Sequence, residues 1–380
     1  MHFRSKPRYR LLFSGYAPVH FACFRPIYKA LQGHPEIEIH LSGGVTVTNA
    51  KGVKVHDPGL MYRPFRLRKP TIVPLTEIAR RRYDLVFCAH VSGFFPGSER
   101  GRVQLFHGLS FRNMAVRRDV LVFDHLFITG PYMMRAFQEN QLLRKNDPRC
   151  IPIGFPKVDR LVDGSLDRGR IRATLGLTGR RPVVLYAPTG LKDNSLETGR
   201  GEEVVKRLKS TGRYDLLIKL HDHARGASRD WPAVMRGYVD AHTKLIRDPD
   251  IVPCLYAADL LLTDASSVSS EYCLLDRPMV FIDVPELLEA VRKKGNALDL
   301  ETWGRRGGIT ANWPDEVVEA VADALRHPSQ GSEVRRAMAK DLFYNPGRAT
   351  QAAVRWILGF LGLEPDSRPG TKETRTGDRT

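Results

Sequence analysis

The sequence predicts an α/β fold with two doubly wound, Rossmann-like domains that face a central cleft. Short apolar runs alternate with amphipathic segments, a pattern typical of βαβ units and parallel sheets. The alternation is interrupted at 159–181 by a polar segment rich in Gly, Arg and Asp. A chain of 380 residues is also long for one domain, so two domains of ordinary size are expected.

The apolar runs that end in Gly, Ser, His or Asp are the expected strands. In the first half of the chain they are 10–15, 37–43, 84–90, 103–108, 125–130 and 150–154. Residues 24–31 and 132–143 have the spacing of amphipathic helices. In the second half the expected strands are 182–190, 215–223, 243–248, 259–267 and 278–284.

These elements define the expected domains. We expect an acceptor-side α/β domain at 1–160, a junction at 161–181 and a nucleotide-donor-binding α/β domain at 182–345. A C-terminal helix should follow within 346–365, with a part around 352–361 packed back on the first domain. Residues 366–380 lack periodicity and are expected to be disordered.

Composition narrows the class of protein. No run of 18 apolar residues indicates a transmembrane helix, and the basic N-terminus leads into a strand rather than a signal peptide. The five scattered cysteines contain no C-x-x-C pair and predict reduced, mostly buried thiols of a cytoplasmic protein. No helix-turn-helix, zinc-finger or RNP-like pattern is present, so no nucleic-acid partner is expected.

The net charge of +17 predicts anionic partners. Basic residues cluster at 4–10, 63–82 and 112–118. Each cluster taken alone fits an ordinary solvated surface, but together they suit a phosphorylated substrate or an anionic membrane surface.

The segment LLLTDASSVSSEYCLLDRP at 260–278 is the most informative part of the chain. It reads as a buried strand that ends in Asp264, Ser266 and Ser267 and turns into a helix at 268–275. Such a turn presents hydroxyl and backbone N–H groups together, which suits a phosphate. The alternative is that Asp264 or Ser266 only caps the helix.

Other strand ends carry polar motifs. They are His107-Gly108 with Arg112, the GFPKVDRL segment at 154–161, Leu185–Gly190 (LYAPTG), and Lys219 with His221. Lys219 and His221 would share a face if their strand extends that far. In open parallel sheets, ligands bind outside the carboxyl ends of the strands, so these residues are expected at one ligand site.

Together and in this order, the motifs resemble the CDP-glycerol glycerophosphotransferase family, the teichoic-acid primases and polymerases. That family has HG followed by Lys, then G-x-P-R-x-D-x-L, a Tyr-Ala-Pro-Thr turn, K-x-H and T-D-x-S-S-V. The match runs from Gln104 to Pro278, and the GRAT sequence at 347–350 also fits. The resemblance implies a GT-B-like fold.

Several positions depart from the family pattern. Leu109-Ser110 replaces Thr-Pro, Gly190 replaces an aromatic residue, and Asp222 replaces a proline. Glu271 stands where the family often has Asp. The membrane-targeting extensions of the large polymerases are not expected here. These departures bear on the acceptor and on the transferred group.

The chemistry that the resemblance implies gives each residue a hypothetical role. His107 is the candidate general base, and His221 would stabilise the phosphoryl group with help from Lys219 or Arg112. Thr189, Ser266 and Ser267 would hold the donor phosphates, Glu271 would accept from the ribose hydroxyls, and Asp264 would orient the loop. Weaker acceptor-side candidates are Ser14, Gly15 and His20, and weaker histidine candidates are His90 and His223.

Each of these residues also has a purely structural interpretation. His107 could make only a structural hydrogen bond, Lys219 could be a solvated lysine at a strand end, and Glu271 could be a first-turn glutamate favoured by the helix dipole. No metal-ligand spacing, dinucleotide fingerprint or P-loop is present, so no metal and no cofactor are expected.

The predicted function is therefore transfer of a polyol phosphate from a CDP-activated donor. A hydroxyl of a lipid-linked or polymeric glycan would be the acceptor, with CMP released at the inner face of the cell membrane. Two alternatives stay open at this point. One is a GT-B nucleotide-sugar glycosyltransferase or an enzyme like UDP-sugar 2-epimerase, and the other is a non-catalytic protein that binds an anionic ligand.

Overall fold

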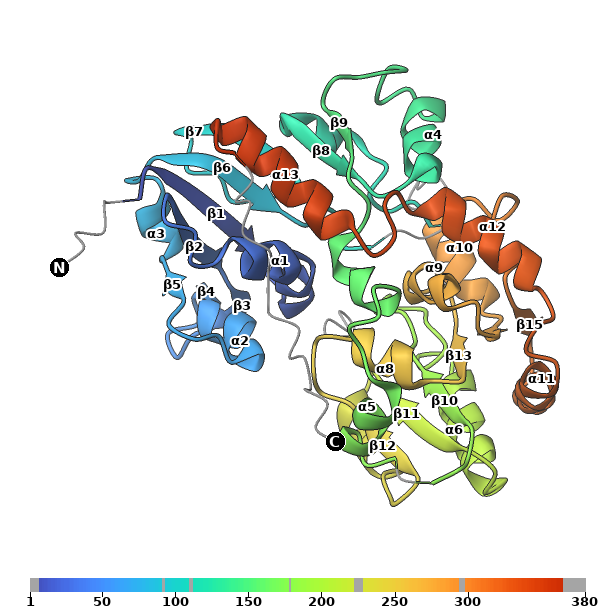
Figure 1. The fold of residues 1–380 in the computed structure, drawn as a ribbon. Helices are drawn as coiled ribbons and strands as arrows, with labels where there is room; N and C mark the ends of the chain where they lie inside the picture. The colour runs from blue at the N-terminus through green and yellow to red at the C-terminus, as the bar shows by residue number, and fades with distance from the viewer. Residues whose placement is uncertain are drawn as a thin grey trace, which may run out of the picture.

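The computed structural model describes residues 7–90, 93–108, 112–177, 179–221, 228–293 and 298–364. Two parallel sheets organise the chain, one in each half (Figure 1). The first has the strand order β5-β2-β1-β6-β7-β8-β9, and the second has the order β12-β11-β10-β13-β14-β15. The predicted fold class of two doubly wound α/β domains is confirmed.

The strands of the first sheet are β1 (Tyr9–Gly15), β2 (Ile37–Gly43), β5 (Thr71–Ile72), β6 (Tyr83–Cys88), β7 (Glu99–Gln104), β8 (His125–Ile128) and β9 (Cys150–Pro152). Those of the second sheet are β10 (Val183–Tyr186), β11 (Asp215–Ile218), β12 (Thr243–Leu245), β13 (Leu260–Thr263), β14 (Met279–Ile282) and β15 (Ile309–Ala311). The central strands β10, β11, β13 and β14 are buried throughout, as their unbroken apolar runs require in a sheet covered on both faces.

The helices that cover the sheets are α1 (Pro18–Leu31), α4 (Pro131–Glu139), α5 (Arg168–Thr174), α6 (Arg200–Ser210), α7 (Trp231–Arg236), α8 (Val252–Ala257), α9 (Val268–Tyr272), α10 (Pro285–Lys293), α11 (Pro314–Arg326), α12 (Ser332–Leu342) and α13 (Ala349–Leu361). Shorter helices are α2 (Pro58–Tyr62), α3 (Leu75–Ile78), η1 (Arg63–Phe65), η2 (Arg118–Val122), η3 (Pro156–Leu161) and η4 (Cys273–Leu275). No helix in the described ranges has the length and apolar character needed to cross a membrane.

The two faces of the second sheet belong to different apolar cores. Leu185, Leu217 and Leu261 point to one face and pack with α8, α9 and the core of the first domain. Their sequence neighbours point to the other face, as the two-residue period of a strand requires, and pack with α6, α7, α10 and α11. One continuous core therefore runs from the first sheet to the near face of the second.

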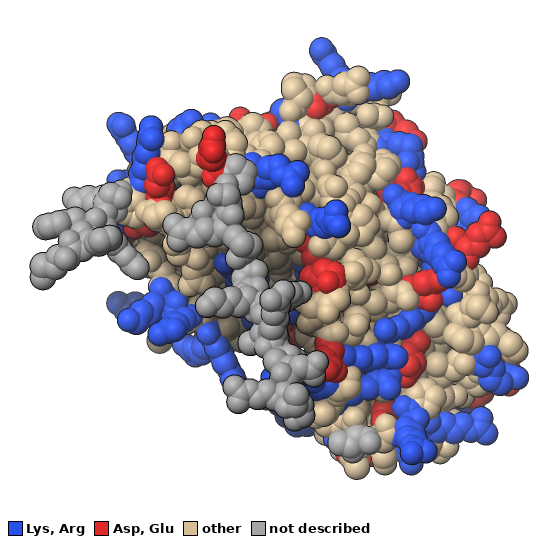
Figure 2. All heavy atoms as spheres, viewed as in Figure 1, with Lys and Arg blue, Asp and Glu red and all other residues tan. Residues whose placement is uncertain are grey.

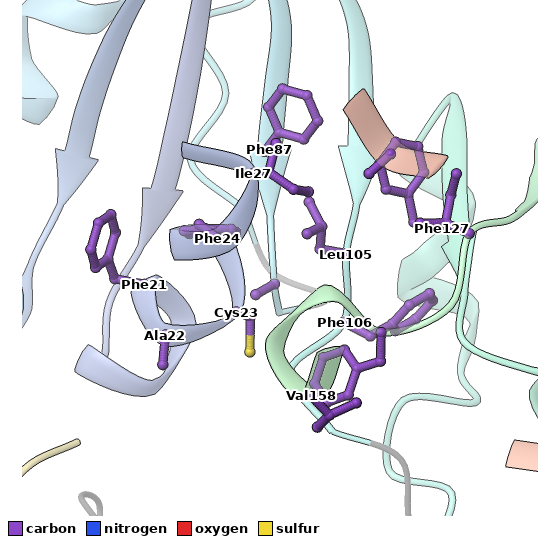
Figure 3. Close-up of a cluster of buried hydrophobic side chains, with 14 of the residues drawn as sticks. Phe21, Ala22, Cys23, Phe24, Ile27, Phe87, Leu105, Phe106, Phe127 and Val158 are labelled. Atoms are coloured by element: carbon purple, nitrogen blue, oxygen red, sulfur yellow. The ribbon is translucent and has the colours of Figure 1, made fainter. Parts of the chain in front are cut away.

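Helix α1 supplies much of the first domain's core. Figure 3 shows Phe24 and Cys23 of α1 in the same buried cluster as Phe87 of β6 and Phe127 of β8. Phe13 stacks on Phe87 with ring centroids 4.7 Å apart. Val158 of η3 lies on the same side near Phe106, so the segment that leaves the first domain is part of its core (Figure 3).

The chain returns to the first domain at its C-terminus, where α13 runs along the first sheet (Figure 1). Trp356 of α13 packs edge-on against Phe127 of β8, with centroids 5.1 Å apart. The side chain of Asp159 in η3 caps the N-terminus of this helix. Its carboxylate accepts hydrogen bonds from the N–H groups of Ala349 (3.0 Å) and Thr350 (2.7 Å). The GFPKVD and GRAT motifs therefore meet in space as a helix cap.

Gly154 is required where that return crosses β9. Its φ is +96°, and a Cβ there would lie 2.0 Å from the carbonyl oxygen of Tyr344. A larger residue would displace the segment that leads into α13.

Several expected boundaries were wrong. The strand expected at 103–108 is β7, which ends at Gln104, and the strand expected at 215–223 is β11, which ends at Ile218. Lys219 and His221 therefore follow β11 and do not share one face of a strand. Helix α1 begins at Pro18 rather than at Phe24. The sequence interpretation also missed the hairpin of β3 (Val45–Thr48) and β4 (Lys54–Asp57). The five cysteines are free thiols, four of them buried, and the predicted disorder at 366–380 falls outside the described residues.

Replacing Asp159 by alanine tests the helix cap. The substitution leaves two N–H groups at the start of α13 without their acceptor, so the free energy of unfolding should fall by about 1–3 kcal/mol. Urea unfolding followed by circular dichroism measures the change. A control, Glu319→Ala on the exposed face of α11, should stay within about 0.5 kcal/mol of the parent. Equal stability of the two variants would contradict the capping role.

Candidate functional site

A cleft of about 480 Å³ lies between the carboxyl ends of the two sheets, where ligands bind in open parallel sheets. Loops after β1, β6 and β7 form one wall, and loops after β10, β11 and β13 form the other. The cleft brings together most of the residues predicted from sequence: His20, His90, His107, Arg112, Thr189, Lys219, His221, Ser266, Ser267 and Glu271.

The imidazole of His107 has a defined orientation. Its Nδ1 lies 2.6 Å from the carbonyl oxygen of Ala89, which can only accept a hydrogen bond. Nδ1 therefore carries the proton in the neutral ring, and Nε2 carries the lone pair. This is the tautomer that a general base acting through Nε2 needs.

Two further histidines surround His107. The ring centroids of His20 and His90 lie 5.1 Å and 5.5 Å from that of His107. His20 is buried, and its Nδ1 accepts the N–H of Tyr16 at 3.3 Å. The sequence grouped His20 with the acceptor side, and the fold places it beside the candidate base.

Ser14 and Gly15, also predicted on the acceptor side, do not line the cleft. Ser14 is buried at the end of β1. A Cβ at Gly15 would lie 2.9 Å from the Cβ of His20, so Gly15 makes room for that histidine. Their contribution is to shape the floor beneath the histidines.

Gly108 is the point where the two walls touch. A Cβ at this position would lie 2.9 Å from the Oγ of Ser267. The glycine of the His-Gly motif therefore lets the first domain approach the serine pair of the second.

Asp264 holds the second wall in place. Its carboxylate accepts from the N–H of Thr189 (2.8 Å) and from the N–H (3.1 Å) and Oγ (2.9 Å) of Ser195. Asn194 adds a bond from Nδ2 to the carbonyl of Thr189, at 2.7 Å. The predicted loop-orienting role of Asp264 fits these contacts, whereas Asn194 and Ser195 were missed because only the fold brings them near β13.

Within the described residues, the D-x-S-S motif does not act as a side-chain cap of α9. The side chain of Ser267, the N-cap residue, makes no capping hydrogen bond. The hydrogen bonds of Asp264 go to the loop after β10 instead. Because α9 has only five residues, an anion here would depend on the serine hydroxyls more than on a helix dipole.

Glu271 is paired across the domain boundary. The Nζ of Lys157 in η3 donates to its Oε1 at 2.7 Å, and both side chains are buried. Burial alone would lower the pKa of Lys157, but Glu271 and other acidic neighbours raise it, so the lysine is charged at neutral pH. The other carboxylate oxygen, Oε2, is buried without a hydrogen-bond partner. The sequence prediction overlooked Lys157 as a lining residue.

Two more cations line the cleft. Arg112 is 9% exposed, and its Nε has no hydrogen-bond partner. Burial lowers the pKa of its guanidinium to about 10, while the nearby Asp264 acts in the opposite direction. Lys219 is buried and donates from Nζ to the carbonyl of Leu220 at 3.0 Å.

The remaining predicted features are quickly placed. His221 is exposed on the cleft wall after β11. His223, Asp222, Leu109 and Ser110 lie outside the described residues. In the part of the chain that is described, no group of three or more His, Cys, Asp or Glu could hold a metal ion.

Comparison with solved structures gives the same fold. One structure of the wall teichoic acid polymerase TagF matches with 17% identity and a TM-score of 0.69, over 94% of this chain and 90% of that one. A Staphylococcus aureus MnaA–UDP structure matches with 14% identity and a TM-score of 0.58, over 94% of this chain and 98% of that one. These likenesses support the GT-B-like fold.

Curated relatives are teichoic acid enzymes. The Bacillus subtilis glycerol-phosphate primase is 22% identical over 254 residues, which are 63% of this chain and 58% of the relative. The poly(glycerol phosphate) polymerase of that organism is 22% identical over 353 residues, 83% of this chain and 44% of the relative. The chain thus spans about half the length of these relatives.

A family model covers most of the chain, including the cleft residues that follow β7. Residues 98–359 match the model described as CDP-Glycerol:Poly(glycerophosphate) glycerophosphotransferase. The chain therefore belongs to the CDP-glycerol glycerophosphotransferase family.

Proposed function

We propose that the protein transfers a glycerol phosphate or related polyol phosphate from a CDP-activated donor to a hydroxyl of a lipid-linked or polymeric glycan. The single observation that carries this proposal is the pairing of His107, in its Nε2 lone-pair tautomer, with buried cations in one cleft. A phosphoryl transfer needs a base for the acceptor hydroxyl and positive charge for the phosphoryl oxygens.

Arg112 is the proposed anchor for the donor's diphosphate. A buried guanidinium costs free energy unless an anion or hydrogen-bond acceptors compensate for its lost hydration. Arg112 makes no ion pair within the described residues and lines the cleft. A diphosphate would supply the missing partner, with Lys219, Thr189, Ser266 and Ser267 around it.

The transfer step is then a displacement at the phosphorus that carries the polyol. Nε2 of His107 takes the proton of the acceptor hydroxyl as the new O–P bond forms. The bond between that phosphorus and the bridging oxygen of the diphosphate breaks, and CMP leaves with the electron pair. His221 meets the negative charge that develops on the phosphoryl oxygens or on the leaving phosphate.

Glu271 is the proposed partner of the ribose. Its Oε1 is held by Lys157, which leaves the buried Oε2 as an acceptor for a ribose hydroxyl. The ion pair would fix the carboxylate so that Oε1 binds Lys157 and Oε2 accepts a hydrogen bond from the ligand.

The proposed location is the inner face of the cell membrane. Figure 2 shows Lys and Arg side chains gathered at the lower left, over the part of the molecule that carries α2 in Figure 1. Each basic residue near an anionic bilayer contributes roughly 1 kcal/mol of attraction.

The donor class is tested by thermal stability with nucleotides. CDP and CDP-glycerol should raise the melting temperature more than UDP, because a ligand that binds only the folded state stabilises it. Arg112→Gln should weaken CDP binding roughly tenfold or more, whereas Arg112→Lys, which keeps the charge but loses the bidentate guanidinium, should weaken it less. A preference for UDP, or full CDP affinity in Arg112→Gln, would count against the assignment.

The two histidines are tested by turnover. His107→Ala and His221→Ala should each lose about 10²–10³-fold in kcat while CDP binding largely survives. The double variant should be worse by less than the product of the two losses, since both groups act in one step. His327→Ala, an exposed histidine at the end of α11, is the control and should keep full activity. Normal turnover in either single variant would defeat the proposed mechanism.

A further inference from the structure

A second cavity, of about 820 Å³, adjoins the cleft. Arg25 of α1, Leu60 of α2, and Arg63, Phe65 and Arg66 at η1 line it from the first domain, and Arg247 lines it from the second. Pro249 borders both this cavity and the central cleft. The two cavities therefore lie next to each other on the two sides of Pro249.

The cavity carries an excess of positive charge. Four arginines line it, and Asp248 is the acidic residue among the lining side chains. The nearby Asp250 is shared, because it binds both Arg25 (3.3 Å) and Arg160 (2.5 Å). Burial, followed by the charges of these two arginines, lowers the pKa of Lys29, and Asp250 acts in the opposite direction.

Three of the lining arginines are available to a ligand. Arg63, Arg66 and Arg247 are exposed, and none of them forms an ion pair with another described residue. The Nε of Arg25 is buried without a hydrogen-bond partner. Arginine in this state is suited to bidentate contact with phosphate oxygens.

The same cavity has an apolar side. Leu60 is 42% exposed, and the neighbouring Phe65 lies under the guanidinium of Arg25, 5.7 Å from its ring centroid. A purely ionic ligand, such as free phosphate, would leave this apolar surface in water. A ligand with hydrocarbon next to a phosphate would cover it.

We propose that this second cavity binds the phosphate of an amphiphile, with the phosphate on Arg63, Arg66, Arg247 and Arg25 and the adjoining hydrocarbon on Leu60. The inference rests on the proposed function, in which the acceptor is lipid-linked. It places the acceptor's phosphate next to Pro249, so that a hydroxyl further along the acceptor enters the cleft. A phospholipid headgroup offers the same chemistry and is the other source that the test separates.

The test uses octyl phosphate and isothermal titration calorimetry on the full chain with saturating CDP, which occupies the donor phosphate site. Octyl phosphate should bind at least tenfold more tightly than inorganic phosphate or octyl glucoside, which carry only one of its two parts. Arg63→Gln/Arg66→Gln should weaken octyl phosphate binding tenfold or more and leave CDP affinity unchanged.

The matched control removes two exposed arginines elsewhere, Arg213→Gln/Arg236→Gln, and should bind like the parent. Equal octyl phosphate affinity in the Arg63/Arg66 variant and the control overturns the proposal. Competition by dihexanoyl phosphatidylglycerol supports the cavity and identifies a phospholipid source, whereas octyl phosphate binding without that competition supports the acceptor's own phosphate. If the unmodified protein does not bind CDP at all, that result refutes the proposed function, independently of this cavity.

Discussion

The buried ion pair between Lys157 and Glu271 fixes the geometry on which the cleft depends. It joins η3, the segment that leaves the first domain, to α9 of the second domain. Removing one partner would leave an uncompensated buried charge, which costs about 3–5 kcal/mol, whereas the intact pair adds little net stability. We interpret the pair as a contact that fixes the position of α9 relative to the first domain. It sets α9, and with it Ser266 and Ser267, against the His-Gly loop of the first domain.

Charge is arranged around that contact in two ways. The carboxylate of Asp264 is already hydrogen-bonded within the protein, because it accepts from the N–H of Thr189 and the Oγ of Ser195. Arg112 also lines the cleft, but its Nε has no hydrogen-bond partner and it forms no ion pair with another described residue. A diphosphate bound in this cleft would supply Arg112 with an ion-pair partner, and it would lie in the same cleft as the base His107.

Much of this could be predicted from the sequence, because the apolar runs of parallel strands and the polar residues at their ends are local signals. The strands that precede Asp264 and His107 were found in that way. Contacts between distant segments could not be predicted. Lys157 and Glu271, for example, are 114 residues apart, and no spacing rule connects them. The β3–β4 hairpin was missed because its residues are largely exposed, so it lacks a buried apolar run. Lys219 and His221 reach the cleft through the loop after β11 and not through strand alternation.

The central claim is that the cleft performs phosphoryl transfer rather than glycosyl transfer or epimerisation on the same fold. The nucleotide product separates these reactions, because attack at the distal phosphorus releases a nucleoside monophosphate and attack at a sugar carbon releases a diphosphate. We would incubate the protein with CDP-glycerol and a glycan acceptor and identify the nucleotide by ion-exchange chromatography. The account predicts CMP in step with acceptor modification and its loss in His107→Ala. CDP as the product would contradict it.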